Sequence, residues 1–132
     1  MNRHARRVGL FRLLYRVEFF PTEALSEQED FFLEYSDEHY GEKDAKELRE
    51  KFEAILPHIP EFDEKIDSVS KNWRTERMGK VELAILRLAL YEILYDDEVP
   101  VGVAINEAVE LTKEFGDDQS PGFVNAILGR FA

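Results

Sequence analysis

The sequence contains no cysteine, which excludes a disulfide framework, a cysteine-based metal site and a thiol nucleophile. Its three histidines, His4, His39 and His58, lie in different segments and lack the spacing of metal ligands. No Gly-rich phosphate loop, GxSxG or HExxH motif is present. The 28 Asp and Glu residues are numerous enough to pair along helices by chance. We therefore expect no catalysis, no metal and no cofactor.

Long hydrophobic runs are also lacking. The longest apolar stretch, residues 81–95, is interrupted by Glu82, Arg87 and Glu92, so it is too short and too charged to span a bilayer. The amino end carries arginines but no apolar core and cleavage site of a signal peptide. We expect a cytoplasmic protein that does not enter a membrane.

What is present is enough for a folded core. The 132 residues are 44% hydrophobic and include ten phenylalanines, which suits one domain over residues 1–132. Apolar residues recur at helical spacing, and the alternation typical of strands is absent. The sequence predicts an all-α protein of seven helices in two packed subdomains. These are a three-helix N-terminal bundle (about 1–57) and a four-helix C-terminal bundle (about 61–132), separated by Pro57 and Pro60.

Local signals set the expected helix boundaries. The helices are expected at about 3–20, 26–36, 42–56, 62–72, 80–95, 101–115 and from 120 onward. Ser26 and Glu29 have the spacing of a capping box, Gly116 fits a C′ glycine, and Ser120 before Pro121 fits an N-cap. The helix over 80–95 is apolar around most of its circumference, which predicts a central position in the second bundle.

Positive charge is concentrated at the amino end. Residues 1–16 hold five arginines and no acid, whereas the other 116 residues hold 12 Lys and Arg against 28 Asp and Glu. On a helical wheel Arg3, Arg6 and Arg7 continue the apolar stripe of the first helix. Because unpaired burial would be costly, we expect them to overhang the bundle, while Arg12 and Arg16 face solvent. A frayed terminus that binds nothing specific is the alternative.

The most specific pattern lies in residues 81–129. It comprises an apolar helix containing Arg87, Val99-Pro100, Val103-Ala104-Ile105-Asn106-Glu107-Ala108, Phe115-Gly116, Ser120 and Phe123-Val124-Asn125-Ala126. With Arg3-His4-Ala5-Arg6-Arg7 and Leu14-Tyr15 at the amino end, the chain resembles NusB-type transcription antitermination factors. The resemblance implies contact of the arginine-rich motif with single-stranded boxA RNA. Tyr15 would offer a ring face to an unstacked base.

The resemblance also implies a second RNA-facing surface, formed by Arg87, Gln119, Phe123 and Asn125. On the wheel Asn125 lies off the apolar stripe, so its amide is expected to face outward. Arg87, within an apolar helix, fits an internal ion pair as well, with Glu107 or Glu110.

Partners follow from the resemblance and from charge. Gly122 stands where many such proteins carry lysine, so one phosphate contact is missing and the isolated protein should bind RNA weakly. The acidic body suits a basic partner. The resemblance implies NusE, the small-subunit ribosomal protein, with Glu76 and Glu82 at the matching positions. Solvated surface charge is the alternative for both.

The function implied is binding of boxA-type RNA in nascent ribosomal transcripts together with NusE, which tethers that RNA to the RNA polymerase elongation complex. A helical protein-interaction adaptor without RNA binding is the alternative. A third interpretation is the RNA-binding domain of a ribosomal RNA methyltransferase, whose glycine motif is absent here. The sequence leaves open whether the chain forms a homodimer.

Overall fold

The computed structural model describes all 132 residues, and all of its regular elements are helical. The α-helices are α1 (Arg3–Arg16), α2 (Leu25–Tyr35), α3 (Glu42–Ile55), α4 (Ile59–Val69), α5 (Lys80–Tyr95), α6 (Val101–Phe115) and α7 (Ser120–Leu128). Four short 3₁₀ helices, which the sequence analysis did not predict, are η1 (Thr22–Ala24), η2 (Leu56–His58), η3 (Thr75–Arg77) and η4 (Gly129–Phe131). The all-α prediction is therefore confirmed.

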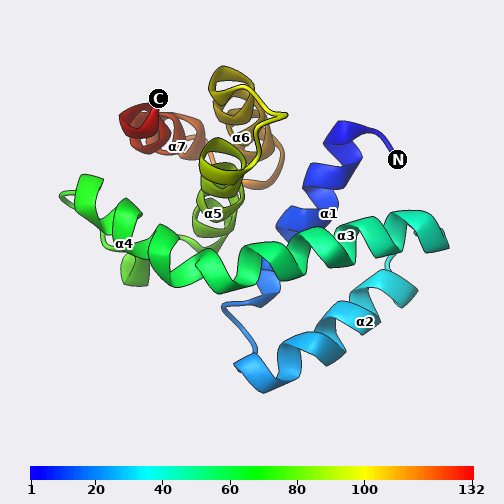
Figure 1. Cartoon of the computed structure of the whole chain (residues 1–132). Coiled ribbons are helices and arrows are strands. Elements are labelled where there is room, and N and C mark those ends of the chain that lie inside the picture. The colour runs from blue at the N-terminus through cyan, green and yellow to red at the C-terminus, as the bar shows by residue number, and fades with distance from the viewer. The chain divides into compact units, whose positions relative to one another are not determined.

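The chain divides into two compact units, Met1–Leu56 and Pro57–Ala132. In the first unit α1 packs against both α2 and α3 (Figure 1). The approach of α1 is close because Gly9 has no side chain: a Cβ there would lie 2.9 Å from the Tyr40 hydroxyl and 3.1 Å from Leu48 Cδ1. The glycine is thus needed for contact between elements and not for its backbone freedom.

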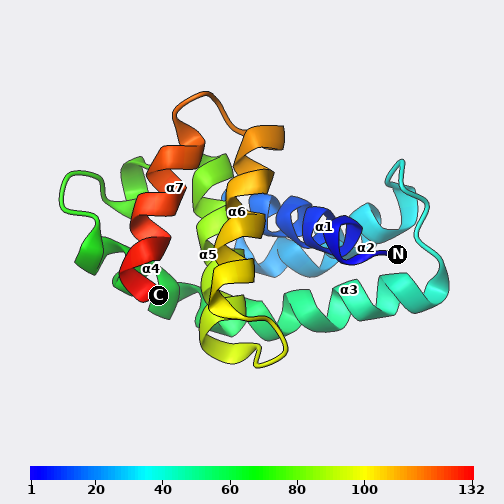
Figure 2. The same ribbon diagram turned by 90° about the horizontal axis from the view of Figure 1, so that it is seen from above.

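In the second unit α5 packs against α4, α6 and α7, and Figure 2 shows α5, α6 and α7 side by side. Eight consecutive residues, 83–90, are buried, which explains why this helix is apolar all around. Its predicted central position is confirmed. None of the helices combines the length and the apolar character that a membrane span requires.

Two boundaries in the first unit differ from the prediction. α1 ends at Arg16 and not near Phe20, because Phe20 precedes a proline and Glu18 would oppose the helix dipole. The capping box is wrong: η1 runs directly into α2, so Ser26 is already inside the helix and Ala24 precedes it without a side-chain cap. Glu29 is instead buried and accepts a hydrogen bond from Arg49 Nη1 at 3.1 Å.

Three boundaries in the second unit also differ. α4 begins at Ile59, three residues early, because Pro60 falls in the first turn, where its missing N–H costs nothing. Gly116 is not a left-handed C′ glycine; its φ of −97° is ordinary. A Cβ at Gly116 would lie 2.6 Å from Ser120 Oγ, so close packing requires the glycine. Ser120 is inside α7, and Gln119 occupies the N-cap position.

Candidate nucleic-acid interface

The arginines predicted to overhang α1 are in three different environments. Arg3 is exposed, as expected. Arg6 forms an ion pair with Glu47 of α3, Nε to Oε1 at 2.8 Å. Arg7 is buried, with 8% of its surface exposed. The expectation that all three overhang the bundle is therefore wrong for Arg7, whereas Arg6 is half-buried and paired with an acid of the folded unit.

Arg12 and Arg16 also differ from the expectation of solvent-facing charges. Arg12 pairs with Glu38. Arg16 donates from Nη1 to the Arg12 carbonyl at 3.0 Å, and its guanidinium lies 4.7 Å from the centroid of the Phe32 ring. Burial, with a smaller contribution from Arg12, lowers the pKa of Arg16. Much of the positive charge of α1 is thus neutralised or covered within the chain.

Tyr15 is half-buried in a row of rings along one side of α1. Its ring centroid lies 6.1 Å from that of Phe11 and 4.9 Å from that of Phe19. Phe19 itself is 54% exposed. The row offers an aromatic surface toward the C-terminal end of α1, on which a base can stack.

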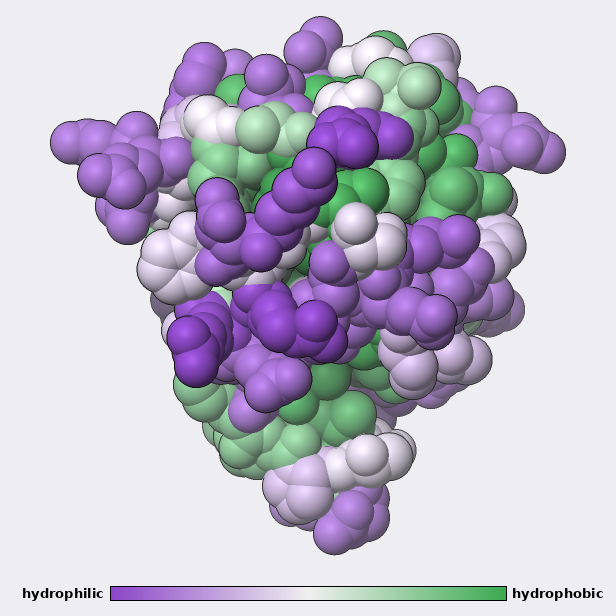
Figure 3. Space-filling model, turned by 90° about the vertical axis from the view of Figure 1, so that its left-hand side faces the viewer, coloured by the Kyte–Doolittle hydropathy of each residue, from purple (hydrophilic) through white to green (hydrophobic).

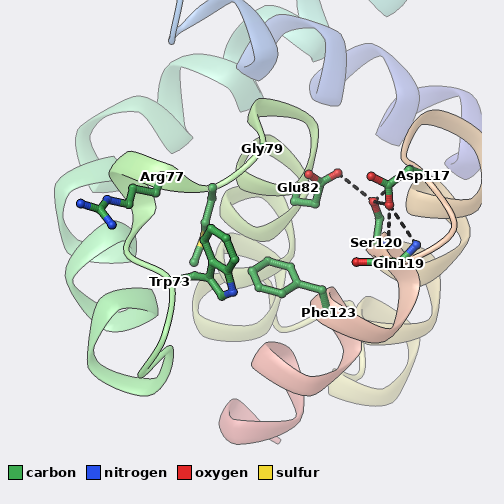
Figure 4. A pocket seen from close by; sticks show the side chains of 9 residues that line it. Trp73, Arg77, Gly79, Glu82, Asp117, Gln119, Ser120 and Phe123 are labelled. Atoms are coloured by element: carbon green, nitrogen blue, oxygen red, sulfur yellow. Dashed lines mark hydrogen bonds between the residues drawn. The ribbon is translucent and has the colours of Figure 1, made fainter.

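The second unit contains a pocket of about 200 Å³. Figure 4 shows its lining: Trp73 from the α4–η3 connector, Arg77 from η3, Glu82 from α5, and Asp117, Gln119, Ser120 and Phe123 from the start of α7 and the preceding loop. Trp73 is 53% exposed and Phe123 is half-buried. Two aromatic side chains from segments far apart in the sequence therefore open onto one cavity.

A hydrogen-bond network builds the polar side of this pocket. Asp117 Oδ1 accepts from the backbone N–H groups of Gln119 at 2.9 Å and Ser120 at 3.1 Å, so Asp117 caps the start of α7. These bonds, that from Gln119 foremost, lower the pKa of Asp117. The Ser120 hydroxyl donates to Glu82 Oε2 at 2.9 Å and accepts from the Asp117 N–H at 3.0 Å. Two carboxylates are thereby held at the pocket wall.

Arg87 is not at the pocket wall. It is 4% exposed and forms a two-pronged ion pair with Asp63 of α4, Nε to Oδ1 at 2.8 Å and Nη2 to Oδ2 at 2.7 Å. The internal ion-pair alternative is the one that the structure contains, with a partner that the sequence did not suggest. Because both groups are tied to each other, Arg87 is poorly placed to bind phosphate.

The remaining predicted residues lie on the second unit. Gln119 and Asn125 are exposed, and Gln119 lines the pocket with Phe123. Glu76, on η3, is exposed, whereas Glu82 is partly buried and bonded to Ser120. The structure thus brings Gln119, Phe123 and Glu82 together at one cavity.

Sequence reasoning missed Trp73, Arg77 and Asp117. The single tryptophan, within a polar connector, was the available signal for the first. An aspartate three residues before the Ser-Pro start of α7 was the signal for the third. Nothing local marks Arg77, whose place depends on how η3 meets α7. No group of three or more His, Asp or Glu side chains is arranged to hold a metal ion.

The lining of the pocket is better suited to contact with a base than to contact with a phosphate group. Its two rings provide stacking surfaces for an unpaired base, and its carboxylates accept hydrogen bonds from exocyclic amines. The same carboxylates repel phosphate, which leaves Arg77 as the local cation. The fold and the pocket together define an all-helical protein with a cleft lined by aromatic side chains.

Comparison with known proteins gives the family. Residues 4–132 match the model of the NusB family, and the chain belongs to this family. It is 45% identical over 134 residues to the transcription antitermination protein NusB of Agathobacter rectalis, covering 100% of both chains. It is also 45% identical over 130 residues to that of Lachnoclostridium phytofermentans, covering 98% of both.

Solved structures resemble the whole chain. NusB of T. maritima is 33% identical with a TM-score of 0.86, over 100% of this chain and 91% of that one. A chain in the crystal structure of a plectonemic RNA supercoil is 28% identical with a TM-score of 0.77, over 98% of this chain and 94% of that one. The NusB resemblance noted in the sequence is confirmed.

Proposed function

We propose that this protein is a transcription antitermination factor that binds boxA-type RNA in nascent ribosomal transcripts together with NusE and tethers that RNA to elongating RNA polymerase in the cytoplasm. The observation that carries the proposal is the family match over residues 4–132, joined by full-length relatives described as antitermination proteins. No catalytic step belongs to this function, which is one of binding and assembly.

The cleft of the second unit supports the RNA part of the proposal. Trp73 and Phe123 supply stacking surfaces, and Gln119 and Asn125 present exposed amides. Amide and carboxylate groups read base edges, while aromatic stacking contributes about 1–3 kcal/mol per base. The exposed Arg3 and the ring row that includes Tyr15 supply a further surface on the first unit.

The charge distribution supports a requirement for a partner. With Arg6 paired to Glu47, Arg87 paired to Asp63 and Gly122 in place of lysine, few free cations face an RNA strand. RNA affinity should therefore be feeble in the isolated protein. A basic partner that binds both the acidic protein and the RNA raises the effective concentration of each weak site. Glu76, exposed on η3, is the better placed of the two proposed contacts to NusE, since Glu82 is bonded to Ser120.

The test is a titration of labelled boxA RNA with this protein, with and without NusE, at several salt concentrations. We expect affinity to rise clearly when NusE is present and to fall as salt increases. A scrambled RNA of the same composition serves as the control and should bind more weakly.

The second candidate is a helical protein-interaction adaptor without RNA binding. The internal pairing of Arg6 and Arg87 and the net charge of −11 favour it. Failure to bind either boxA or scrambled RNA, in the absence and in the presence of NusE, would establish this candidate and overturn the first.

A further inference from the structure

One segment of the first unit is both the most acidic and the most aromatic part of the surface. Residues 17–42 contain nine Asp and Glu and no Lys or Arg. The exposed aromatic residues of the whole chain are Phe19, Phe20, Phe31, Tyr35, Trp73 and Tyr95. Four of these six lie in this segment, although it is only 26 residues long. Acidic side chains therefore coincide with exposed aromatic side chains in this segment.

The coincidence is sharpest on the outer side of α2. Phe31 is 57% and Tyr35 66% exposed, and their ring centroids are 5.2 Å apart. Glu27 and Glu34 are exposed and lie within about 60° of Phe31 around the helix, at 100° per residue. We name these four residues, Glu27, Phe31, Glu34 and Tyr35, the α2 stripe.

The opposite side of α2 is the one that packs in the first unit. Phe32 and Leu33 are buried, and Arg49 of α3 is bonded to Glu29 and Asp30. Figure 1 shows α2 at the edge of the unit, with α3 on one side only. Neither Glu27 nor Glu34 has an ion-pair partner in the chain. The charge and the rings of the stripe are thus both unpartnered.

We propose that the α2 stripe docks a cationic segment of a partner protein in which Lys or Arg residues are interspersed with apolar side chains. Exposed apolar surface occurs elsewhere on the molecule (Figure 3), so exposure alone does not identify the occupant. The charge does. Guanidinium and ammonium groups pair with the two carboxylates and lie over the ring faces, while apolar side chains cover the ring edges.

The same charge argues against other occupants. An RNA strand is a polyanion and would be repelled by the exposed carboxylates of Glu27 and Glu34. A second copy that met this stripe with its own would place like charges opposite each other. The inference goes beyond the proposed function, because no residue of the α2 stripe belongs to the RNA surfaces or to the proposed NusE contacts.

The experiment uses the full chain and a synthetic amphipathic peptide of about 18 residues, with leucine on one helical face and lysine and arginine on the other. Fluorescence anisotropy measures binding, and shifts of backbone amide resonances locate it. Phe31→Ala with Tyr35→Ala removes the rings, and Glu27→Gln with Glu34→Gln removes the charge. Leu94→Ala with Val103→Ala, and Glu64→Gln with Glu98→Gln, are matched controls at exposed positions elsewhere.

We expect each stripe variant to weaken peptide binding about tenfold or more, and the control variants to bind like the unmodified protein. Amide shifts should be largest in residues 25–35. A peptide with the same composition in scrambled order should bind more weakly. BoxA RNA binding should be unchanged in the stripe variants, so failure here is distinguishable from failure of the proposed function.

Three results would overturn the inference. The first is equal peptide binding by stripe and control variants, which would indicate diffuse attraction to an acidic surface. The second is a dimer of the unmodified protein that Phe31→Ala with Tyr35→Ala converts to a monomer, which would assign the stripe to self-association. The third is loss of RNA binding in the folded stripe variants. Circular dichroism verifies folding in each case.

Discussion

Trp73 is the single tryptophan of the chain, and about half of its surface is open to solvent beside the pocket that Phe123 also lines. A side chain this exposed adds little to folding stability, but its ring is free to stack. Its energetic importance should therefore appear in binding and not in unfolding.

Trp73→Ala should weaken RNA binding in the presence of NusE by about 1–3 kcal/mol, because one stacking platform is lost. Trp73→Phe should retain most of the affinity. Anisotropy with labelled boxA RNA measures both. Similar losses in the two variants would show that the indole N–H, and not stacking, is the important group.

Gly122, in the first turn of α7, has no atom within 4 Å of the place where a Cβ would stand. Gly122→Lys should therefore fit without strain and stabilise the helix by up to about 1 kcal/mol. It should also tighten RNA binding and make the salt dependence steeper by about one phosphate contact. Gly122→Gln is the control: the same gain in thermal stability with no gain in salt-dependent affinity is expected.

Glu29 is buried on α2, and burial, followed by repulsion from Glu53, raises its pKa to about 7 despite the nearby Arg49. The folded state thus holds a proton that the unfolded chain, with a carboxyl pKa of about 4.3, has already released. The free energy of unfolding should accordingly fall as pH rises between about 4.5 and 7.

Glu29→Gln should remove this contribution, so the variant should gain stability relative to the unmodified protein as pH rises from about 4.5 to 7. Urea denaturation at several pH values measures the difference. Glu27→Gln, an exposed change on the same helix, should show no such trend. A pH-independent difference for Glu29→Gln would mean that Arg49 keeps the carboxylate ionised throughout.

At the scale of elements, packing between helices depends on particular small residues. Gly9→Ala should destabilise the first unit by about 1–3 kcal/mol, because a methyl group would meet the Tyr40 hydroxyl and Leu48 where α1 contacts α3. Gly102→Ala on α6, with open space around it, should be neutral or slightly stabilising.

Thermal denaturation compares the melting temperatures of Gly9→Ala and Gly102→Ala. The Tyr40 hydroxyl has no hydrogen-bond partner within the protein, so adding Tyr40→Phe to Gly9→Ala should recover part of the loss. If Gly9→Ala were as stable as Gly102→Ala, α1 would be free to move away from α3 at no cost.

For the molecule as a whole, the net charge of −11 has opposite consequences for folding and for RNA binding. Raising salt from about 0.05 to 0.5 M should raise the melting temperature, because self-repulsion is screened. It should lower RNA affinity over the same range, because counterion release becomes less favourable. Melting curves and RNA titrations in one buffer series test the pair. RNA affinity that did not fall with salt would argue against phosphate contacts.

The local part of this fold was predictable. α3, α5 and α6 begin and end within a residue of their predicted bounds, because apolar periodicity and flanking glycine or proline act over one or two turns. The capping box at Ser26 and the N-cap at Ser120 failed since a cap depends on where the preceding backbone goes. The 3₁₀ helix η1 runs directly into α2, and Asp117 caps the start of α7.

From the sequence alone came the helical class, the interruption at Pro57 and Pro60, and the concentration of arginine at the amino end. Only the tertiary structure decided which of those arginines are covered, that Arg87 pairs with Asp63, and that Trp73 shares a pocket with Phe123. The physical reason is the distance along the chain over which each interaction acts. A helix is stabilised by hydrogen bonds four residues apart, whereas the partner of a charge or a ring depends on which helices meet.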